Sequence, residues 1–338
     1  MDPTTHIRAV TPTKILEQAG AYARSMALRA AIELELCDAL DEGLNTAQKL
    51  AQNTKTSVRG MEILLDALVA MELLTKEGDT YHLTPETATY LVQSKPTYLG
   101  ELVEQRVRDV VAFDHLAESV ATGKPWLDWG VQHGGIENYF ADMVPGLYVL
   151  NEPDARKVAR HLFRGQIGSA ARVLDLGAGS GIWGIALAQQ NALATVVALD
   201  TSDVLEVTRQ FVEGHKLDAQ FEYHEGDLLS TDLGESQFDV VILGEICYMF
   251  SPEQNQLLFR RVARGLKTGG RALVTGPLVN DKRTHPTATI LSDLTLLLST
   301  EGGRSHTPGE YRAWLSGAGF GAVEMMDLQD RVAMVATK

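Results

Sequence analysis

The stretch that most constrains the fold of this chain runs from Ala171 to Gly181 and reads ARVLDLGAGSG. Val173–Leu176 form a short apolar run typical of a buried parallel strand, and a helical apolar pattern follows the glycines. Glycines let the backbone approach a ligand closely, and the start of a helix presents free N–H groups. The sequence therefore predicts an α/β fold with a ligand site over the carboxyl end of this strand, held by Gly177, Gly179 and Gly181.

Two details of this turn argue against a dinucleotide pyrophosphate as the ligand. The dinucleotide fingerprint would place its third glycine at position 182, where this chain has Ile182. Asp175 lies two residues before the first glycine, where its carboxylate would repel a diphosphate and attract a cation. The turn therefore favours a cationic, nucleoside-bearing ligand and disfavours a nicotinamide oxidoreductase.

Composition sets wider bounds on the class of protein. The 338 residues suffice for two domains, and 45% hydrophobic with 22% charged residues is ordinary for a soluble globular protein. The net charge of −14 disfavours nucleic acid as a partner. Two cysteines far apart suggest reduced thiols, and no leader-like or membrane-spanning run is present in the sequence. We expect a cytoplasmic protein with no membrane partner.

Residues 1–100 are predicted to form a mostly helical winged-helix domain. Residues 12–42 read as one helix whose apolar residues cover nearly its whole circumference, which suggests burial from two sides. Residues 46–51 and 57–74 then resemble a helix-turn-helix pair, and residues 80–84 resemble a wing strand. The pattern is typical of a winged helix.

The charge of the second helix of this pair bears on whether the domain binds DNA. Residues 57–72 carry Arg59 against Glu62, Asp66 and Glu72, so DNA phosphates would be repelled. A DNA-binding regulator that senses a ligand is therefore the weaker hypothesis. We expect the domain to join two subunits in a homodimer.

Residues 101–165 are predicted to be a helical connector that contributes to the pocket of a small-molecule substrate. It carries Trp126 in a Gly-Lys-Pro-Trp segment, followed by Phe140 and Met143. Aromatic residues and methionines between domains often line such a pocket, although a domain-interface core is an equally good interpretation. We expect Trp126, Phe140 and Met143 to contact the substrate.

Residues 166–338 are predicted to form a ligand-binding domain with a doubly wound, mainly parallel Rossmann-like sheet. Its expected strands cover residues 172–176, 195–200, 219–223, 238–243 and 271–276, with helical patterns between them and a closing pair at 321–327 and 331–336. Alternating strands and helices imply parallel strands with right-handed crossovers, and the last strand is expected to be antiparallel.

The carboxyl ends of these strands carry polar residues that suit a nucleoside. Asp200 ends the second strand, where a carboxylate can accept both hydroxyls of a ribose. Asp227 and Leu228 follow the third strand and suit the two sides of a purine ring, and Gly244 ends the fourth strand. Because parallel strands end at one edge of a sheet, these residues predict a single nucleoside site.

Five ordered motifs resemble those of class I S-adenosylmethionine-dependent methyltransferases. The motifs are VLDLGAGSG at 173–181, LDTSDV at 199–204, GDL at 226–228, FDVVI at 238–242 and LKTGGR at 266–271. The winged-helix start, the Gly-Lys-Pro-Trp segment, and Gly302-Gly303-Arg304 followed by Glu310 resemble small-molecule O-methyltransferases with an N-terminal dimerisation domain. The resemblance implies S-adenosylmethionine as cofactor and a hydroxyl of a small aromatic metabolite as methyl acceptor.

The sequence departs from this family at the expected general base. The family's catalytic His corresponds to Tyr248, and its supporting Glu corresponds to Ser305. A Tyr has an unperturbed pKa of ~10 and is a poor base at neutral pH, so we expect Tyr248 to contact the acceptor and orient it. His306 and His285 are the candidate replacements, ranked equally, with His133 third. No metal is expected, because paired ligand spacing is lacking near Tyr248, and a carbon or nitrogen acceptor stays open.

Overall fold

The computed structural model describes residues 10–128, 136–162, 169–328 and 331–338, without the side chains at 136–138 and 140–142. The chain divides into two compact units, Met1–Asp109 and Val110–Lys338. Each unit has a hydrophobic core of its own.

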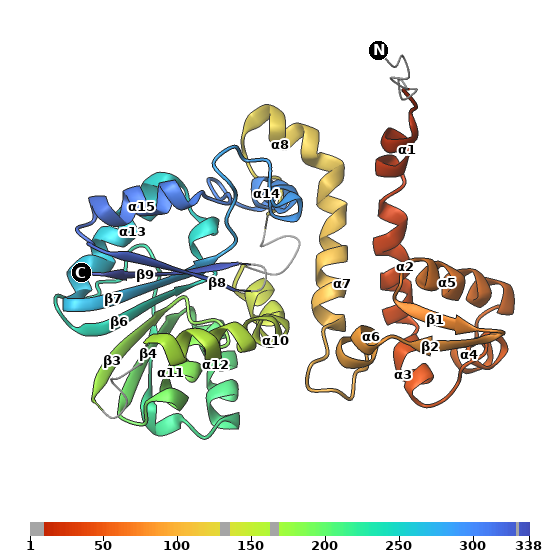
Figure 1. The fold of residues 1–338 in the computed structure, drawn as a ribbon, viewed down its shortest axis with the longest axis horizontal. Helices are drawn as coiled ribbons and strands as arrows, with labels where there is room; N and C mark the ends of the chain where they lie inside the picture. Colours follow the sequence, from red (N-terminus) through yellow and green to blue (C-terminus); the bar gives the residue numbers. More distant parts are fainter. Residues whose placement is uncertain (1–9, 129–135, 163–168, 329–330) are drawn as a thin grey trace, which may run out of the picture. The chain divides into compact units, whose positions relative to one another are not determined.

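The N-terminal unit is mostly helical, with one small hairpin (Figure 1). Its elements are α1 (Thr13–Ala19), α2 (Tyr22–Glu33), α3 (Leu36–Asp41), α4 (Ala47–Thr54), α5 (Val58–Ala70), β1 (Leu74–Glu77), β2 (Thr80–Leu83), α6 (Pro85–Tyr90) and α7 (Gly100–Arg108). The helix pair α4–α5 and the antiparallel strands β1 and β2 match the predicted helix pair and wing. Leu50, Met61 and Leu65 are fully buried between them.

The single helix predicted over residues 12–42 is instead three helices. The chain turns after Gly20 and again at Glu35, whose φ of 50° is left-handed and cannot continue an α-helix. The apolar residues of this segment therefore belong to three successive short helices and not to one continuous helix. The apolar pattern of the sequence continues across both helix ends, so it does not reveal where one helix stops and the next begins.

The C-terminal unit is built on a seven-stranded sheet. Its elements are a short 3-10 helix η1 (Asp109–His115), α8 (Leu116–Thr122), α10 (Ile136–Leu162), β3 (Ala171–Leu176), α11 (Ile182–Gln190), β4 (Ala194–Asp200), α12 (Ser202–Gly214), η2 (Asp218–Gln220), β5 (Phe221–Glu225), β6 (Phe238–Gly244), η3 (Cys247–Met249), α13 (Pro252–Gly265), β7 (Leu266–Gly276), α14 (Thr287–Ser299), α15 (Pro308–Gly317), β8 (Val323–Asp327) and β9 (Val332–Thr337). The strand order is β5-β4-β3-β6-β7-β9-β8.

Strands β3 to β7 are parallel to their neighbours, and β9 runs antiparallel to both β7 and β8. The predicted doubly wound sheet with an antiparallel last strand is confirmed. The third strand begins at Phe221 rather than residue 219, because Asp218–Gln220 form a 3-10 turn. The change of order beside β3 places the carboxyl ends of β3 and β6 at a topological switch point, where open α/β sheets bind their ligands.

Two helical layers cover this sheet (Figure 1). Helices α10, α11 and α12 pack on one face, and α13 and α15 pack on the other. Side chains of β3 alternate between the layers: Val173 packs in the first core, and Leu174 and Leu176 pack in the second. None of the helices in the described ranges is long and apolar enough to cross a membrane.

Helix α13 shows how local sequence fixes an element that borders the site. The Ser251 hydroxyl oxygen accepts a hydrogen bond from the Gln254 backbone N–H, the Ser251 backbone N–H donates to Gln254 Oε1, and Pro252 occupies the first turn. Leu258 and Phe259 are fully buried against the sheet. The helix start is therefore held firmly just after η3.

Candidate active site

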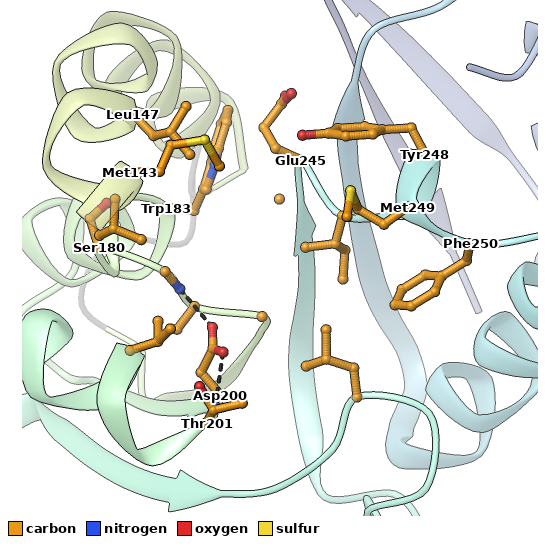
Figure 2. Close-up of a pocket in the computed structure, with 18 of the residues that line it drawn as sticks. Met143, Leu147, Ser180, Trp183, Asp200, Thr201, Glu245, Tyr248, Met249 and Phe250 are labelled. Carbon is orange, nitrogen blue, oxygen red and sulfur yellow. Dashed lines mark hydrogen bonds between the residues drawn. The ribbon is translucent and has the colours of Figure 1, made fainter. Parts of the chain in front are cut away.

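A cavity of about 560 Å³ lies over the carboxyl ends of β3, β4, β5 and β6. Its walls come from the glycine turn after β3, from α10, from the segment 244–250 and from the end of α14. Figure 2 shows Met143, Leu147 and Trp183 on one side and Tyr248, Met249 and Phe250 on the other. The ligand site predicted at the strand ends is thus a real cavity.

The glycine turn forms part of the cavity wall with its backbone. Gly177, Gly179 and Gly181 have φ values of 76°, 55° and 71°, a conformation that L side chains rarely adopt. Gly177 and Gly179 line the cavity, and a Cβ on Gly177 would lie 2.9 Å from Ile246 Cγ2. Gly181 lies behind them as the N-cap of α11, outside the cavity lining. It shapes the turn rather than the surface.

Asp175 does not lie where its sequence position suggested. Its side chain is fully buried on the α11 side of β3 and is not part of the cavity lining. Its Oδ2 accepts a hydrogen bond from Gly184 N at 2.9 Å, and burial raises the pKa of the carboxyl to about 8. The alternation of side chains in a strand directs Asp175 into the core with Val173, so its expected direct contact with the ligand is not seen in this geometry.

Asp200 ends β4 and does line the cavity. Its Oδ2 accepts from Gly179 N at 3.0 Å and its Oδ1 accepts from Thr201 N at 2.9 Å, as Figure 2 shows. Burial raises the pKa of this carboxyl, and the two backbone hydrogen bonds lower it. A carboxylate has about four acceptor sites, so two hydrogen bonds leave capacity for a ligand diol.

Three further predicted residues also line the cavity: Asp227, Leu228 and Gly244. Asp227 Oδ1 accepts from Leu229 N at 3.1 Å and from Ser230 Oγ at 2.7 Å, which fixes its orientation after β5. A Cβ on Gly244 would lie 2.5 Å from Trp183 Cδ1. Glycine at 244 therefore lets the indole of Trp183 pack against the end of β6.

The residues predicted to contact the acceptor separate in the structure. Met143 and Tyr248 line the cavity, whereas Trp126 does not. Trp126 stacks on His115 with ring centroids 3.9 Å apart and packs beside Leu127, so it belongs to a core of its own. The side chain of Phe140, like His133, lies outside the described residues.

Neither of the two other candidate bases lines the cavity. His306 is fully buried, with its Nε2 3.2 Å from Asn255 Nδ2 and 3.3 Å from the carbonyl oxygen of Phe250, and burial lowers its pKa. Asn255 also donates to Cys247 O at 2.9 Å, so this buried pair holds η3, which carries Tyr248. His285 is exposed and lies outside the cavity lining. Sequence adjacency to a loop did not determine which way these rings point.

Two residues that line the cavity, Glu245 and Trp183, were not among the residues predicted to contact the methyl acceptor. Glu245 follows Gly244 with a left-handed φ of 59°. The same signal that identified Asp200, an acid at the end of a central strand, was present at Glu245. No group of three or more His, Cys, Asp or Glu side chains that could hold a metal ion occurs within the described ranges.

Comparisons with known proteins agree with this geometry. A family model described as an O-methyltransferase domain matches residues 154–321, and one described as an O-methyltransferase dimerisation domain matches residues 16–93. The chain belongs to the S-adenosylmethionine-dependent O-methyltransferases. The predicted family, fold, cofactor and enzyme class of this methyltransferase are confirmed.

Relatives resemble the methyltransferase over nearly its whole length. The tetracenomycin polyketide synthesis 8-O-methyl transferase TcmO of Streptomyces glaucescens is 29% identical over 95% of this chain and 94% of its own length. Bovine acetylserotonin O-methyltransferase is 28% identical over 90% of this chain and 91% of its own. A crystal structure of a putative O-methyltransferase from Nostoc punctiforme aligns with a TM-score of 0.89 at 27% identity, covering 98% of this chain and 100% of that one.

Proposed function

We propose that the methyltransferase methylates a hydroxyl of a small aromatic molecule that binds in the cavity beside Tyr248. The main support for this proposal is the composition of the cavity wall. Strand-end acids and glycines line one part, and apolar and aromatic side chains with the Tyr248 hydroxyl line the other. Relatives support an aromatic acceptor, since one is named a tetracenomycin polyketide synthesis 8-O-methyl transferase and another a 3-hydroxy-5-methyl-1-naphthoate 3-O-methyltransferase.

The cofactor residues follow from the positions of the strand ends. We assign the ribose diol to Asp200, the adenine to Asp227 and Leu228, and the methionine end to the backbone of Gly177 and Gly179. The left-handed glycines and the free acceptor sites of Asp200 fit such a ligand. Bound S-adenosylmethionine supplies a methyl carbon attached to a positively charged sulfur.

The protein's own work is then to place and orient the acceptor. Met143, Leu147 and Trp183 form an apolar wall that excludes water from the acceptor, and Tyr248 offers it a hydroxyl as hydrogen-bond partner. Alignment of a nucleophile with a bound electrophile removes much of the entropic cost of the reaction. No metal is required for this chemistry.

An amine acceptor is the second candidate function. A relative named N,N-dimethyltransferase OxyT is 29% identical over 94% of this chain. Parallel assays with phenols and with anilines of matched size separate the two functions, because only one class should be methylated efficiently.

We further propose a cytoplasmic homodimer joined through the N-terminal unit. Residues 16–93 match a dimerisation domain, and Ile15, Leu16 and Tyr22 on α1 and α2 have exposed fractions of 73%, 65% and 67%. Such an exposed apolar face needs a partner surface. Both cysteines, Cys37 and Cys247, are free and buried, as expected in a reducing compartment. Light scattering that gives a monomer mass at micromolar concentration would contradict the dimer.

Calorimetry and a methyl-transfer assay test the main proposal together. Purified enzyme should bind S-adenosylmethionine and S-adenosylhomocysteine, and it should release S-adenosylhomocysteine when given a phenol or naphthol. Absence of cofactor binding, or binding without transfer to any phenol or naphthol, would overturn it.

A further inference from the structure

Glu245 occupies a special position at the end of β6. Its backbone is left-handed, with a φ of 59°, and its N–H donates to Thr275 O at 3.1 Å, which ties the residue to β7. A left-handed non-glycine residue costs free energy, and such residues cluster at functional sites. This conformation directs the carboxylate of Glu245 into the cavity, on the side toward which the Tyr248 hydroxyl also points in Figure 2.

A largely buried arginine holds this carboxylate in place. Arg331 Nη1 lies 3.2 Å from Glu245 Oε1, and the two side chains are only 17% and 16% exposed. Arg331 is itself fixed from α10, by a hydrogen bond to Asn151 Oδ1 and by Asp154 Oδ2 at 3.5 Å from its Nε. The buried carboxylate of Asp154 and the largely buried one of Glu245 thus share one guanidinium, and Glu245 faces the cavity.

The other acids of the cavity lie in its proposed cofactor part or are exposed. Both oxygens of Asp200 accept backbone N–H groups, and Asp227 is oriented by its own turn. Glu301 also lines the cavity but is exposed to solvent. No histidine lines the cavity among the residues that the structure describes. Glu245 is therefore the largely buried carboxylate on the same side of the cavity as Tyr248, the residue at the position of the family's catalytic His.

We infer that Glu245 is the catalytic residue that accepts the proton of the acceptor hydroxyl, with Arg331 as its positioning residue and Tyr248 orienting the same hydroxyl. This inference rests on the proposed function. The acceptor oxygen forms a bond to the methyl carbon while the bond from that carbon to sulfur breaks, and the electron pair leaves with the sulfur as neutral S-adenosylhomocysteine. The hydroxyl proton passes to Glu245, which returns it to solvent after the ether has left.

The charged and titratable groups around Glu245 suit this role. Burial raises the pKa of its carboxyl, Arg331 and a hydrogen bond with Thr275 lower it, and Asp154 raises it. Its other titratable neighbours are Cys247 and Tyr311, whose pKa values burial raises so that both stay neutral, and Tyr248. Because burial raises the pKa of its carboxyl, the ionised form of Glu245 is a stronger base than an exposed carboxylate, as a general base requires.

The inference is tested with two phenols of similar size but different acidity. Glu245→Gln keeps the shape of the side chain and removes its basicity. With 4-methoxyphenol, whose hydroxyl stays protonated, kcat should fall about 10²- to 10⁴-fold, the usual contribution of a general base. With 4-nitrophenol above the pKa of its own hydroxyl, the loss should nearly vanish because the acceptor is already ionised. An equal loss with both phenols would overturn the inference.

Two measurements that do not depend on turnover distinguish a catalytic role of Glu245 from a purely structural one. Calorimetry should give the same affinity of the variant for S-adenosylmethionine. In the complex with S-adenosylhomocysteine, bound 4-nitrophenol should ionise at a lower pH in Glu245→Gln, by about one pH unit or more, because a neighbouring negative charge is gone. An unchanged ionisation pH would show that Glu245 does not face the acceptor and would overturn the inference.

A matched control and a second variant complete the design. Glu213→Gln makes the same substitution on an exposed acid of α12 outside the cavity and should behave as wild type. Arg331→Gln should move the acidic limb of the kcat profile to higher pH, because Arg331 lowers the pKa of Glu245. If the acidic limb of the kcat profile does not shift in Arg331→Gln, Arg331 is not a positioning residue for Glu245. A wild-type enzyme that binds S-adenosylmethionine but methylates neither phenol contradicts the proposed function, whereas an active wild type with an equally active Glu245→Gln contradicts only this inference.

Discussion

The buried carboxyl of Asp175 makes a quantitative prediction about stability. It is fully buried between β3 and α11, Gly184 N–H donates to its Oδ2, and its pKa is raised from 3.8 to about 8. Asp175→Asn keeps the shape and the acceptor oxygen but removes the ionisation. The variant therefore isolates the cost of burying a charge at this position.

The sign and the size follow from linkage between protonation and folding. Between pH 4 and pH 8 the folded state binds the Asp175 proton and the unfolded state does not, so the wild type loses stability as pH rises. One pKa unit corresponds to ~1.4 kcal/mol, so from pH 5 to pH 7 the free energy of unfolding of Asp175→Asn should rise by about 2.7 kcal/mol relative to wild type.

Urea unfolding followed by tryptophan fluorescence at pH 5, 6 and 7 measures this difference. All four tryptophans follow residue 110, so the signal reports on the C-terminal unit. Cofactor affinity should survive in Asp175→Asn, whereas Asp175→Ala should weaken it, since the Gly184 N–H then loses its partner beneath the glycine turn. A difference between Asp175→Asn and wild type that stays constant within ~0.5 kcal/mol over this pH range would refute the reasoning.

Three further variants probe the cavity. Asp200→Ala should weaken S-adenosylmethionine binding about 10-fold or more in calorimetry, because hydrogen bonds to a charged group each contribute ~1.5–3 kcal/mol. An unchanged affinity would show that Asp200 does not bind the ribose. Gly244→Ala should lower thermal stability and cofactor affinity together, because a Cβ would lie 2.5 Å from Trp183 Cδ1; wild-type values for both would contradict the tight fit. Tyr248→Phe should raise the KM for a phenol more than it lowers kcat, as expected for an orienting hydroxyl; a kcat loss as large as that of Glu245→Gln would instead make the tyrosine part of the proton path.

Much of the cofactor end was predictable because it depends on backbone and strand ends. A left-handed glycine and an acid at or just after the end of a strand have positions fixed by the local chain, and the predicted cofactor residues Gly177, Gly179, Asp200 and Asp227 all line the cavity. Asp175 is the instructive exception. Its residue type suggested a ligand contact, but strand alternation turned it into the core.

The acceptor end was less predictable because it is assembled from residues far apart in sequence. Trp126 packs on His115, and His306 packs among Tyr311 and Trp314, so rings that suggested a pocket form other cores. Arg331 contacts Glu245 because β7 pairs with β9, and no local sequence pattern predicts that contact. Side-chain direction in loops depends on tertiary packing, which periodicity does not report.

The two parts of the cavity wall differ in how freely they can change during evolution. The cofactor part is made by the ends of sheet strands. A substitution there disturbs the backbone of strands that are hydrogen-bonded into one seven-stranded sheet. The acceptor part includes side chains of α10 and of residues 248–250, which lie outside the sheet and can be substituted without altering it. A lineage could therefore acquire new acceptors by exchanging side chains of α10 and of residues 248–250 while inheriting its methyl donor unchanged.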